Sequence, residues 1–105
     1  MSKSSITTNP DWLHNSHAGE LVEREFMEPL GLTPEVLASA IDMPVEALRA
    51  VLKGDGPMNA ELDLRLGRYF RMSEGFFLRL HDQYELLEAK RMLNGSLDRI
   101  VPRAA

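Results

Sequence analysis

Two cations in the middle of the chain, Arg49 and Lys53, are the residues best suited to binding chemistry. They lie one helical turn apart, so in a helix both side chains project from the same outer face. A guanidinium there can read a guanine edge in the major groove, and an ammonium can hold a backbone phosphate. A solvated helix face would carry the same two residues without any such function. The pair therefore predicts a nucleic-acid contact, with an ordinary surface helix as the alternative.

Three neighbouring residues can contribute to the same interface. Glu46 can accept a hydrogen bond from a cytosine amino group, and Ala47 can touch a thymine methyl group. Thr33 can donate its hydroxyl to a phosphate. The alternatives are structural: an acid in the first turn of a helix stabilises the macrodipole, and a threonine before a helix is a common N-cap. The expected DNA-binding set is Thr33, Glu46, Ala47, Arg49 and Lys53.

Other kinds of chemistry find no support in the sequence. His14, His17 and His81 lack the helical i,i+4 ligand spacing and the chain has no cysteine, so we expect no metal and no cofactor. His17 is instead expected to cap the first helix. The sequence has no glycine-rich phosphate loop and no nucleophile elbow. We therefore predict a binding protein and not an enzyme.

The stretch 32–54, LTPEVLASAIDMPVEALRAVLKG, predicts two short helices joined by a turn. Thr33 and Pro34 are typical of a helix start, Asp42 interrupts the pattern, and Gly54 supplies a stop. Such a unit is a helix-turn-helix, whose second helix can enter a major groove. An ordinary pair of helices in a small bundle is the alternative. The apolar residues at helical spacing, expected to be buried, are Val36, Leu37, Ala40 and Ile41, then Val45, Leu48, Val51 and Leu52.

Three further helices are predicted around this unit. The first spans residues 19–30, the fourth begins after an Asn59 cap, and Ser73 is expected to cap a fifth that runs to about Leu93. No strand pattern is present, so the fold class is all-α with five helices. The residues expected to face the core are Leu21, Val22 and Phe26, then Leu62, Leu66, Tyr69 and Phe70, then Phe76, Phe77 and Leu80; Arg65 and Arg68 are expected to be solvated.

Length and charge limit the possible functions. A chain of 105 residues with 44% hydrophobic content suits one domain. We expect an N-terminal arm at 1–16, the helical domain at 17–94 and a C-terminal tail at 95–105. No apolar stretch suits a signal peptide or a membrane span, so a cytoplasmic protein without membrane contact is expected. The net charge of −4 provides no overall basic field, which weakens a nucleic-acid function unless cations cluster locally.

Two groups of apolar residues predict protein partners. Four on the fifth helix have no obvious partner within the domain core, which predicts a two-fold homodimer. They are Tyr84, Leu86, Leu87 and Leu93. In the arm, Trp12 and Leu13 can anchor a partner protein, because tryptophan is enriched at binding hot spots. A local hydrophobic plug is the alternative for this pair.

Residues 17–84 resemble the HigA-like antitoxins, a family within the Xre-type helix-turn-helix proteins. Residues 17–20 (HAGE) are close to the family's H-P-G-E opening, and 25–33 (EFMEPLGLT) resemble its E-E-F-L-E-P-L-G-L-S run. Residues 64–70 (LRLGRYF) and 76–78 (FFL) resemble its L-R-L-A-R-Y-F and F-W-L blocks. The resemblance implies a dimeric, lambda-repressor-like domain that neutralises a small basic mRNA-cleaving toxin and represses its own operon. Trp12 and Leu13 then become the expected toxin contact.

The sequence departs from the family pattern where the family binds DNA. Pro34 replaces the usual glutamine, Asp42 replaces a glycine in the turn, and Asp55 and Gly56 replace a basic pair. Residues 45–49 read VEALR where P-S-R-I-N is common. Because phosphate neutralisation supplies most non-specific affinity, DNA binding should be weak or should depend on other cations. The candidates are Arg65, Arg68 and Arg71, or Lys90 and Arg91.

These departures keep two alternatives to an antitoxin open. One is a stand-alone Xre-type transcription regulator without a toxin. The other is a helix-turn-helix fold kept only for protein–protein interaction.

Overall fold

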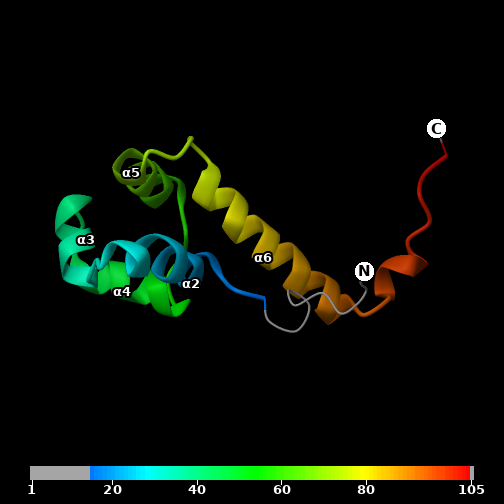
Figure 1. The fold of residues 1–105 in the computed structure, drawn as a ribbon. Helices are drawn as coiled ribbons and strands as arrows, with labels where there is room; N and C mark the ends of the chain where they lie inside the picture. Colours follow the sequence, from blue (N-terminus) through cyan, green and yellow to red (C-terminus); the bar gives the residue numbers. More distant parts are fainter. Residues whose placement is uncertain (1–14, 105) are drawn as a thin grey trace, which may run out of the picture.

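The protein is a cluster of helices from which one long helix projects (Figure 1). A computed structural model describes residues 15–104. The first helical segment has three parts, α2 (Ala18–Leu21), the π-helical η2 (Val22–Met27) and the 3-10 turn η3 (Glu28–Leu30). It is followed by α3 (Pro34–Ala40), α4 (Val45–Lys53), α5 (Ala60–Phe70), α6 (Phe76–Leu93) and the 3-10 turn η4 (Ser96–Arg99). Within the described range no strand occurs, and the predicted all-α fold is confirmed.

Three of the helix starts are capped as the sequence predicts. His17 Nδ1 accepts a hydrogen bond from the Glu20 amide at 3.1 Å. Thr33 Oγ1 accepts from the amide of Val36 at 3.2 Å, and Asn59 Oδ1 accepts from that of Leu62 at 2.9 Å. Each of these side chains satisfies an amide that has no partner inside its helix.

The first helical segment differs from a regular helix in its middle. The π-helical turns of η2 place Val22 and Met27, five residues apart, in the core with 1% exposure each. Leu21 and Phe26, which were predicted to face inward, are half-buried. A simple helical repeat does not predict Met27, because the wider π turn moves the inward position by one residue.

The core lies between η2, α3, α4, α5 and the first turn of α6. Leu37, Leu66 and Phe77 are fully buried, and the other three phenylalanines, Phe26, Phe70 and Phe76, pack around Phe77 in edge or tilted contacts. The rings of Phe26 and Phe77 lie 5.2 Å apart between centroids. This aromatic cluster attaches α6 to the helical body.

Three residues predicted to be buried are exposed. On α3, Ala38 is buried in place of Val36 and Ala40, because α3 packs through Leu37 and Ala38; Val36 is 53% exposed. On α5, Tyr69 is 41% exposed, because the buried stripe follows Leu62, Leu66 and the neighbouring small or acidic positions.

The start of α6 is capped from another helix. Ser73 was predicted to cap it, but the residue before the helix is Gly75, in a left-handed conformation with φ of 89°, and it makes no side-chain cap. Asp63 of α5 supplies the carboxylate instead. Its Oδ2 accepts from the Gly75 amide at 2.7 Å, and its Oδ1 accepts from the amides of Phe77 and Leu78 at 2.8 and 3.2 Å. The prediction for Ser73 is therefore wrong.

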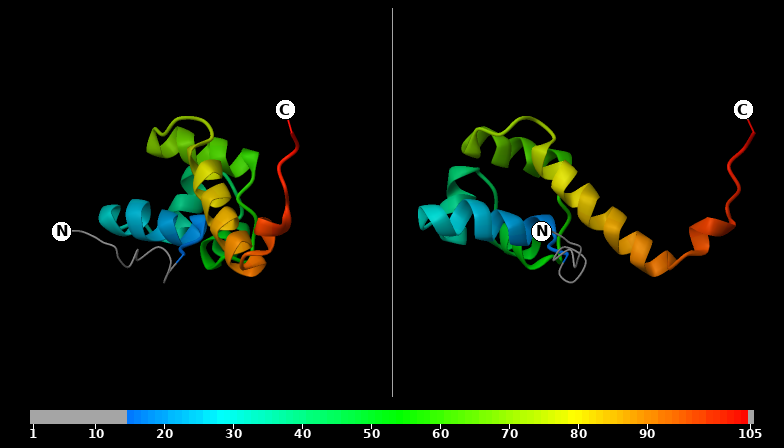
Figure 2. Two further views of the ribbon diagram at one scale, coloured as in Figure 1. Left: turned by 90° about the vertical axis from the view of Figure 1, so that its right-hand side faces the viewer. Right: turned by 45° about the vertical axis from the view of Figure 1, so that its right-hand side comes forward.

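The second half of α6 and the segment after it leave the helical body (Figure 2). The molecule measures 50 × 37 × 24 Å and its radius of gyration is 17.0 Å, against about 13 Å for a compact chain of 100 residues. None of the described helices combines the length and apolar character needed to cross a membrane.

Candidate nucleic-acid interface

The helix-turn-helix is formed by α3 and α4. Ile41 and Asp42 make the turn, and Asp42 has φ of 57°, in the left-handed region where glycine is favoured. Leu48, Val51 and Leu52 bury one side of α4 against α2 and α3, as predicted. On the opposite side of α4, Glu46, Ala47 and Lys53 are exposed.

Thr33 occupies the exposed start of α3. Its hydroxyl oxygen serves as the N-cap acceptor, so the structural role predicted for it is present. The hydroxyl also carries a hydrogen of its own, which it can donate to a phosphate while its oxygen accepts from Val36. The geometry is therefore compatible with both roles given to Thr33.

Arg49 is not a free cation. Its Nη2 forms an ion pair with Oε2 of Glu35 on α3, and its Nε lies 3.8 Å from Oε2 of Glu46 on α4. Glu46 is 84% exposed in its side chain and Glu35 is 59% exposed. Helical spacing predicts that Arg49 faces outward, but it does not predict the contact with Glu35, which lies 14 residues earlier.

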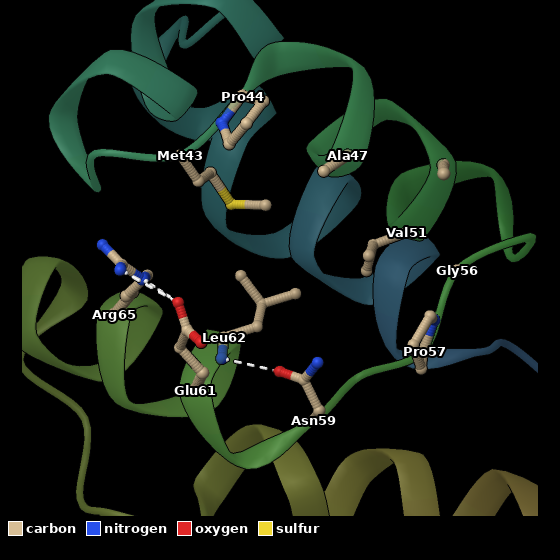
Figure 3. Close-up of a pocket in the computed structure, with 11 residues that line it drawn as sticks. Met43, Pro44, Ala47, Val51, Gly56, Pro57, Asn59, Glu61, Leu62 and Arg65 are labelled. Atoms are coloured by element: carbon tan, nitrogen blue, oxygen red, sulfur yellow. Dashed lines mark hydrogen bonds and ion pairs between the residues drawn. The ribbon is translucent and has the colours of Figure 1, made fainter.

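Lys53 and Ala47 differ from Arg49, because within residues 15–104 neither side chain makes a hydrogen bond or an ion pair. Lys53 is exposed at the last turn of α4, and within residues 15–104 it has no ion pair. Ala47 borders a hollow of about 340 Å³ between α4 and the start of α5 (Figure 3). Met43, Pro44 and Val51 line the same hollow, so the flank of α4 next to α5 is apolar.

Arg65 connects α5 to the turn of the helix-turn-helix. Its Nη1 donates to the carbonyl oxygens of Ile41 and Asp42, both at 2.9 Å, and its Nε donates to Glu61 at 3.0 Å. The Glu61 contact is visible in Figure 3. The prediction that Arg65 is solvated is wrong, because its guanidinium holds the turn of the helix-turn-helix.

Arg68, in the last turn of α5, and Arg71, the residue that follows this helix, are both exposed. With Leu64 and Tyr69 they border a hollow of about 560 Å³ that also reaches Ala40 at the end of α3. They therefore lie beside the C-terminal end of α3. Neither residue lines the hollow beside α4.

The residues predicted for dimer formation fall into two groups. Tyr84 has a partner within the chain, because its ring meets the His17 ring edge-on at 6.1 Å and its carbonyl oxygen accepts from Asn15 Nδ2 at 2.9 Å. Leu87 is half-buried beside the same N-terminal segment. Leu86 and Leu93 are 61% and 41% exposed. Of the four residues, Leu86 and Leu93 are thus the ones left exposed in the described part of the chain.

The residues predicted for toxin binding, Trp12 and Leu13, lie outside the described residues. The helical segment that follows them is strongly acidic. It carries Glu20, Glu23, Glu25 and Glu28 against a single cation, Arg24, which pairs with Glu20 at 3.3 Å and Glu25 at 3.5 Å. Among residues 15–104, no group of three or more His, Cys, Asp or Glu side chains could hold a metal ion.

Comparisons with known proteins relate this arrangement to DNA-binding proteins. No family model matches the chain. Virulence-associated protein I of Dichelobacter nodosus is 28% identical over 87 residues, which cover 83% of this chain and 81% of the relative. PA4674 of Pseudomonas aeruginosa, solved in complex with its 18-bp operator DNA, is 27% identical with a TM-score of 0.80, covering 86% of this chain and 96% of that one.

An addiction module antidote protein of the HigA family from Coxiella burnetii is 25% identical with a TM-score of 0.76. The match covers 85% of this chain and 97% of that one. The resemblance to the HigA-like antitoxins is confirmed. The similarity to this HigA-family protein extends beyond the helix-turn-helix into α6, because the match covers most of both chains. The names of these three proteins describe a virulence-associated protein, an operator-binding protein and an antidote, and none describes an enzyme.

Proposed function

We propose that the protein is the antitoxin of a type II toxin–antitoxin pair. It neutralises a small basic mRNA-cleaving toxin by direct binding and represses its own operon through α3 and α4. The observation that carries this proposal is a helix-turn-helix with one free side of α4, in a fold shared with an operator-bound protein and with a HigA-family antidote protein. Both activities place the protein in the cytoplasm.

In this proposal, DNA binds along the outer side of α4. Glu46, Ala47, Arg49 and Lys53 line this side, and Thr33 meets a phosphate at the start of α3. This set contains two cations and the acidic Glu46. The affinity for DNA should therefore depend less on salt than that of a DNA-binding protein with a strongly basic surface. The test is an electrophoretic shift with the protein's own promoter.

The toxin binds the acidic helical segment and the arm that precedes it. Charge complementarity supports this choice, because four glutamates of residues 18–30 face a partner expected to be basic. DNA binds elsewhere on the molecule, so one antitoxin can hold both partners. Co-purification with the product of a short basic reading frame beside the gene tests the pair.

Trp12→Ala tests the predicted anchor in the arm. If Trp12 inserts into the toxin, the substitution should weaken toxin binding by about 2 kcal/mol or more, because buried tryptophans dominate interface energies. Isothermal titration with purified toxin measures the change, and a thermal melt of the free antitoxin should be nearly unaltered. Lost stability with intact toxin binding would favour the plug instead.

The two alternatives are distinguished by the same experiments. Promoter binding without any toxin partner identifies a stand-alone regulator. Toxin binding without promoter binding identifies a fold kept for protein interaction, and the pairing of Arg49 with two glutamates is the observation that favours this second candidate.

A further inference from the structure

Arg49 joins the two helices of the helix-turn-helix through carboxylates. Glu35 contacts Nη2 from α3, and Glu46 lies near Nε from the preceding turn of α4. Both contacts fall on the same edge of the guanidinium, the one formed by Nε and Nη2. That edge is one of those through which an arginine makes paired hydrogen bonds to a guanine or a phosphate. In the free protein, carboxylates therefore occupy a DNA-binding edge of Arg49.

The charge of this group opposes phosphate. Two carboxylates and one guanidinium sum to one net negative charge beside the surface that DNA must approach. The side chain of Arg49 is 36% exposed, while those of Glu35 and Glu46 are more exposed, so an arriving phosphate meets the acids first. Exposed ion pairs contribute little to folding stability. Their main consequence is for what Arg49 can bind.

We propose that Glu35 and Glu46 clamp Arg49 and thereby determine the specificity of the DNA interface, an inference that rests on the proposed DNA-binding function. On DNA of arbitrary sequence, the contact of Arg49 with a phosphate only replaces its contacts with carboxylates. Non-specific binding is therefore suppressed. At the operator, a correctly placed guanine edge offers paired hydrogen bonds that displace the carboxylates. The clamp thus widens the difference between operator and other DNA while lowering total affinity.

The test compares Glu35→Gln, Glu46→Gln and the double variant, each with and without Arg49→Ala. The probes are labelled duplexes of equal length, one from the protein's own promoter and one of random sequence, followed by fluorescence anisotropy across a salt series. The matched control is Glu25→Gln, because Glu25 is 61% exposed and also pairs with an arginine, but on η2. Circular dichroism melts establish that every variant is folded.

Release of Arg49 should raise affinity for the random duplex about three- to tenfold and steepen the logarithmic salt dependence by about 0.9, the value of one extra phosphate contact. Promoter affinity should rise less, so the ratio between the two duplexes should fall. The whole gain should disappear when Arg49→Ala is added. If a variant binds DNA when the wild type binds neither duplex, the carboxylates block Arg49 on every sequence, and the proposed release of Arg49 at the operator is overturned.

Several results would overturn the clamp. A gain that persists with Arg49→Ala reflects only the removal of negative charge, and a gain matched by Glu25→Gln reflects only net charge. Wild-type promoter binding, with affinities for both duplexes that the glutamine variants leave unchanged, refutes the clamp but preserves the proposed function. If neither the wild type nor any variant binds either duplex, the clamp and the DNA-binding function both fail.

Discussion

Asp63 is a single buried side chain on which the position of α6 depends. It is 2% exposed, yet its two oxygens accept three backbone amides at the start of α6. A carboxylate at a helix N-terminus also interacts favourably with the macrodipole. Because Phe77 lies in the same turn and is fully buried, this cap fixes both the direction of α6 and the aromatic core.

Replacing Asp63 should therefore destabilise the whole fold. We expect Asp63→Ala to lower the free energy of unfolding by about 2–4 kcal/mol, because a helix cap is lost and buried amides lose their partner. Asp63→Asn should cost less, since one carbonyl oxygen remains. Urea unfolding followed by circular dichroism measures both. Asp82→Ala, on the exposed side of α6, is the control, and an equal loss there would contradict the argument.

Lys53 provides a residue-scale test of the DNA contact. It is exposed at the end of α4 without an ion pair in residues 15–104, so it should meet the DNA backbone and carry no sequence information. Lys53→Ala should weaken binding to all duplexes by a similar factor and reduce the salt slope by about one. Anisotropy titrations on promoter and random duplexes measure this. A loss confined to the promoter would instead make Lys53 a base contact.

At the scale of elements, the sequence predicts helices well where caps and stops are local. Thr33, Asn59 and Gly54 determine boundaries within a few residues, and those helices are found as expected. Contacts between distant residues were missed. Asp63 reaches Phe77 across 14 residues and Arg65 reaches Ile41 across 24, and neither residue type signals its partner in the sequence.

The candidate DNA-binding residues show the same difference between local features, which the sequence predicts, and contacts between helices, which it does not. The positions of Thr33, Glu46, Ala47, Arg49 and Lys53 on α3 and α4 follow from helical spacing, whereas the ion pair between Arg49 and Glu35 depends on how the two helices cross. A helical repeat also cannot reveal the π turns of η2, which depend on packing in three dimensions.

A substitution at Gly19 tests how closely α2 and α4 pack where they cross. Alanine in a helix is ordinarily about 1 kcal/mol more favourable than glycine. Here an added Cβ would clash with the Val51 carbonyl oxygen, so alanine should be less favourable than glycine at this position. We expect Gly19→Ala to lower the free energy of unfolding by about 2–3 kcal/mol through overpacking.

The control for Gly19 is Gly31→Ala. Nothing lies within 4 Å of a Cβ there, but φ is +66°, so only a backbone cost of about 1–2 kcal/mol applies. Urea unfolding of both variants compares the two effects. A Gly19→Ala protein as stable as the wild type would mean that α2 and α4 separate easily.

At the scale of the whole molecule, exposed apolar residues concentrate toward the C-terminal end. Leu86, Met92 and Leu93 are exposed on the projecting part of α6, and Leu97, Ile100 and Val101 follow on the segment after it. Tyr84 and Leu87 are partly covered by the N-terminal segment of their own chain. The exposed apolar surface available to a second copy is therefore the outer part of α6 and the segment after it. This surface packs against neither the aromatic core nor residues 15–17.

We expect two copies to associate through this outer part of α6. Leu86 and Leu93 lie two helical turns apart and so share a face, and a two-fold pair would present two α4 helices to successive major grooves, about 34 Å apart. Leu86→Asp with Leu93→Asp should give a monomer at micromolar concentration in sedimentation velocity, and should weaken promoter binding because each copy then reads one half-site.

Val36→Asp is the matched control for the dimer, because Val36 is 53% exposed on α3, within the helical body. It should leave the dimer intact. Tyr84→Ala should chiefly lower thermal stability, since its ring packs against His17 in the same chain. A wild-type protein that sediments as a monomer would contradict the dimer. A dimer that survives both aspartate substitutions but dissociates with Tyr84→Ala would place the interface nearer the start of α6. In that case the second copy would have to displace the N-terminal segment.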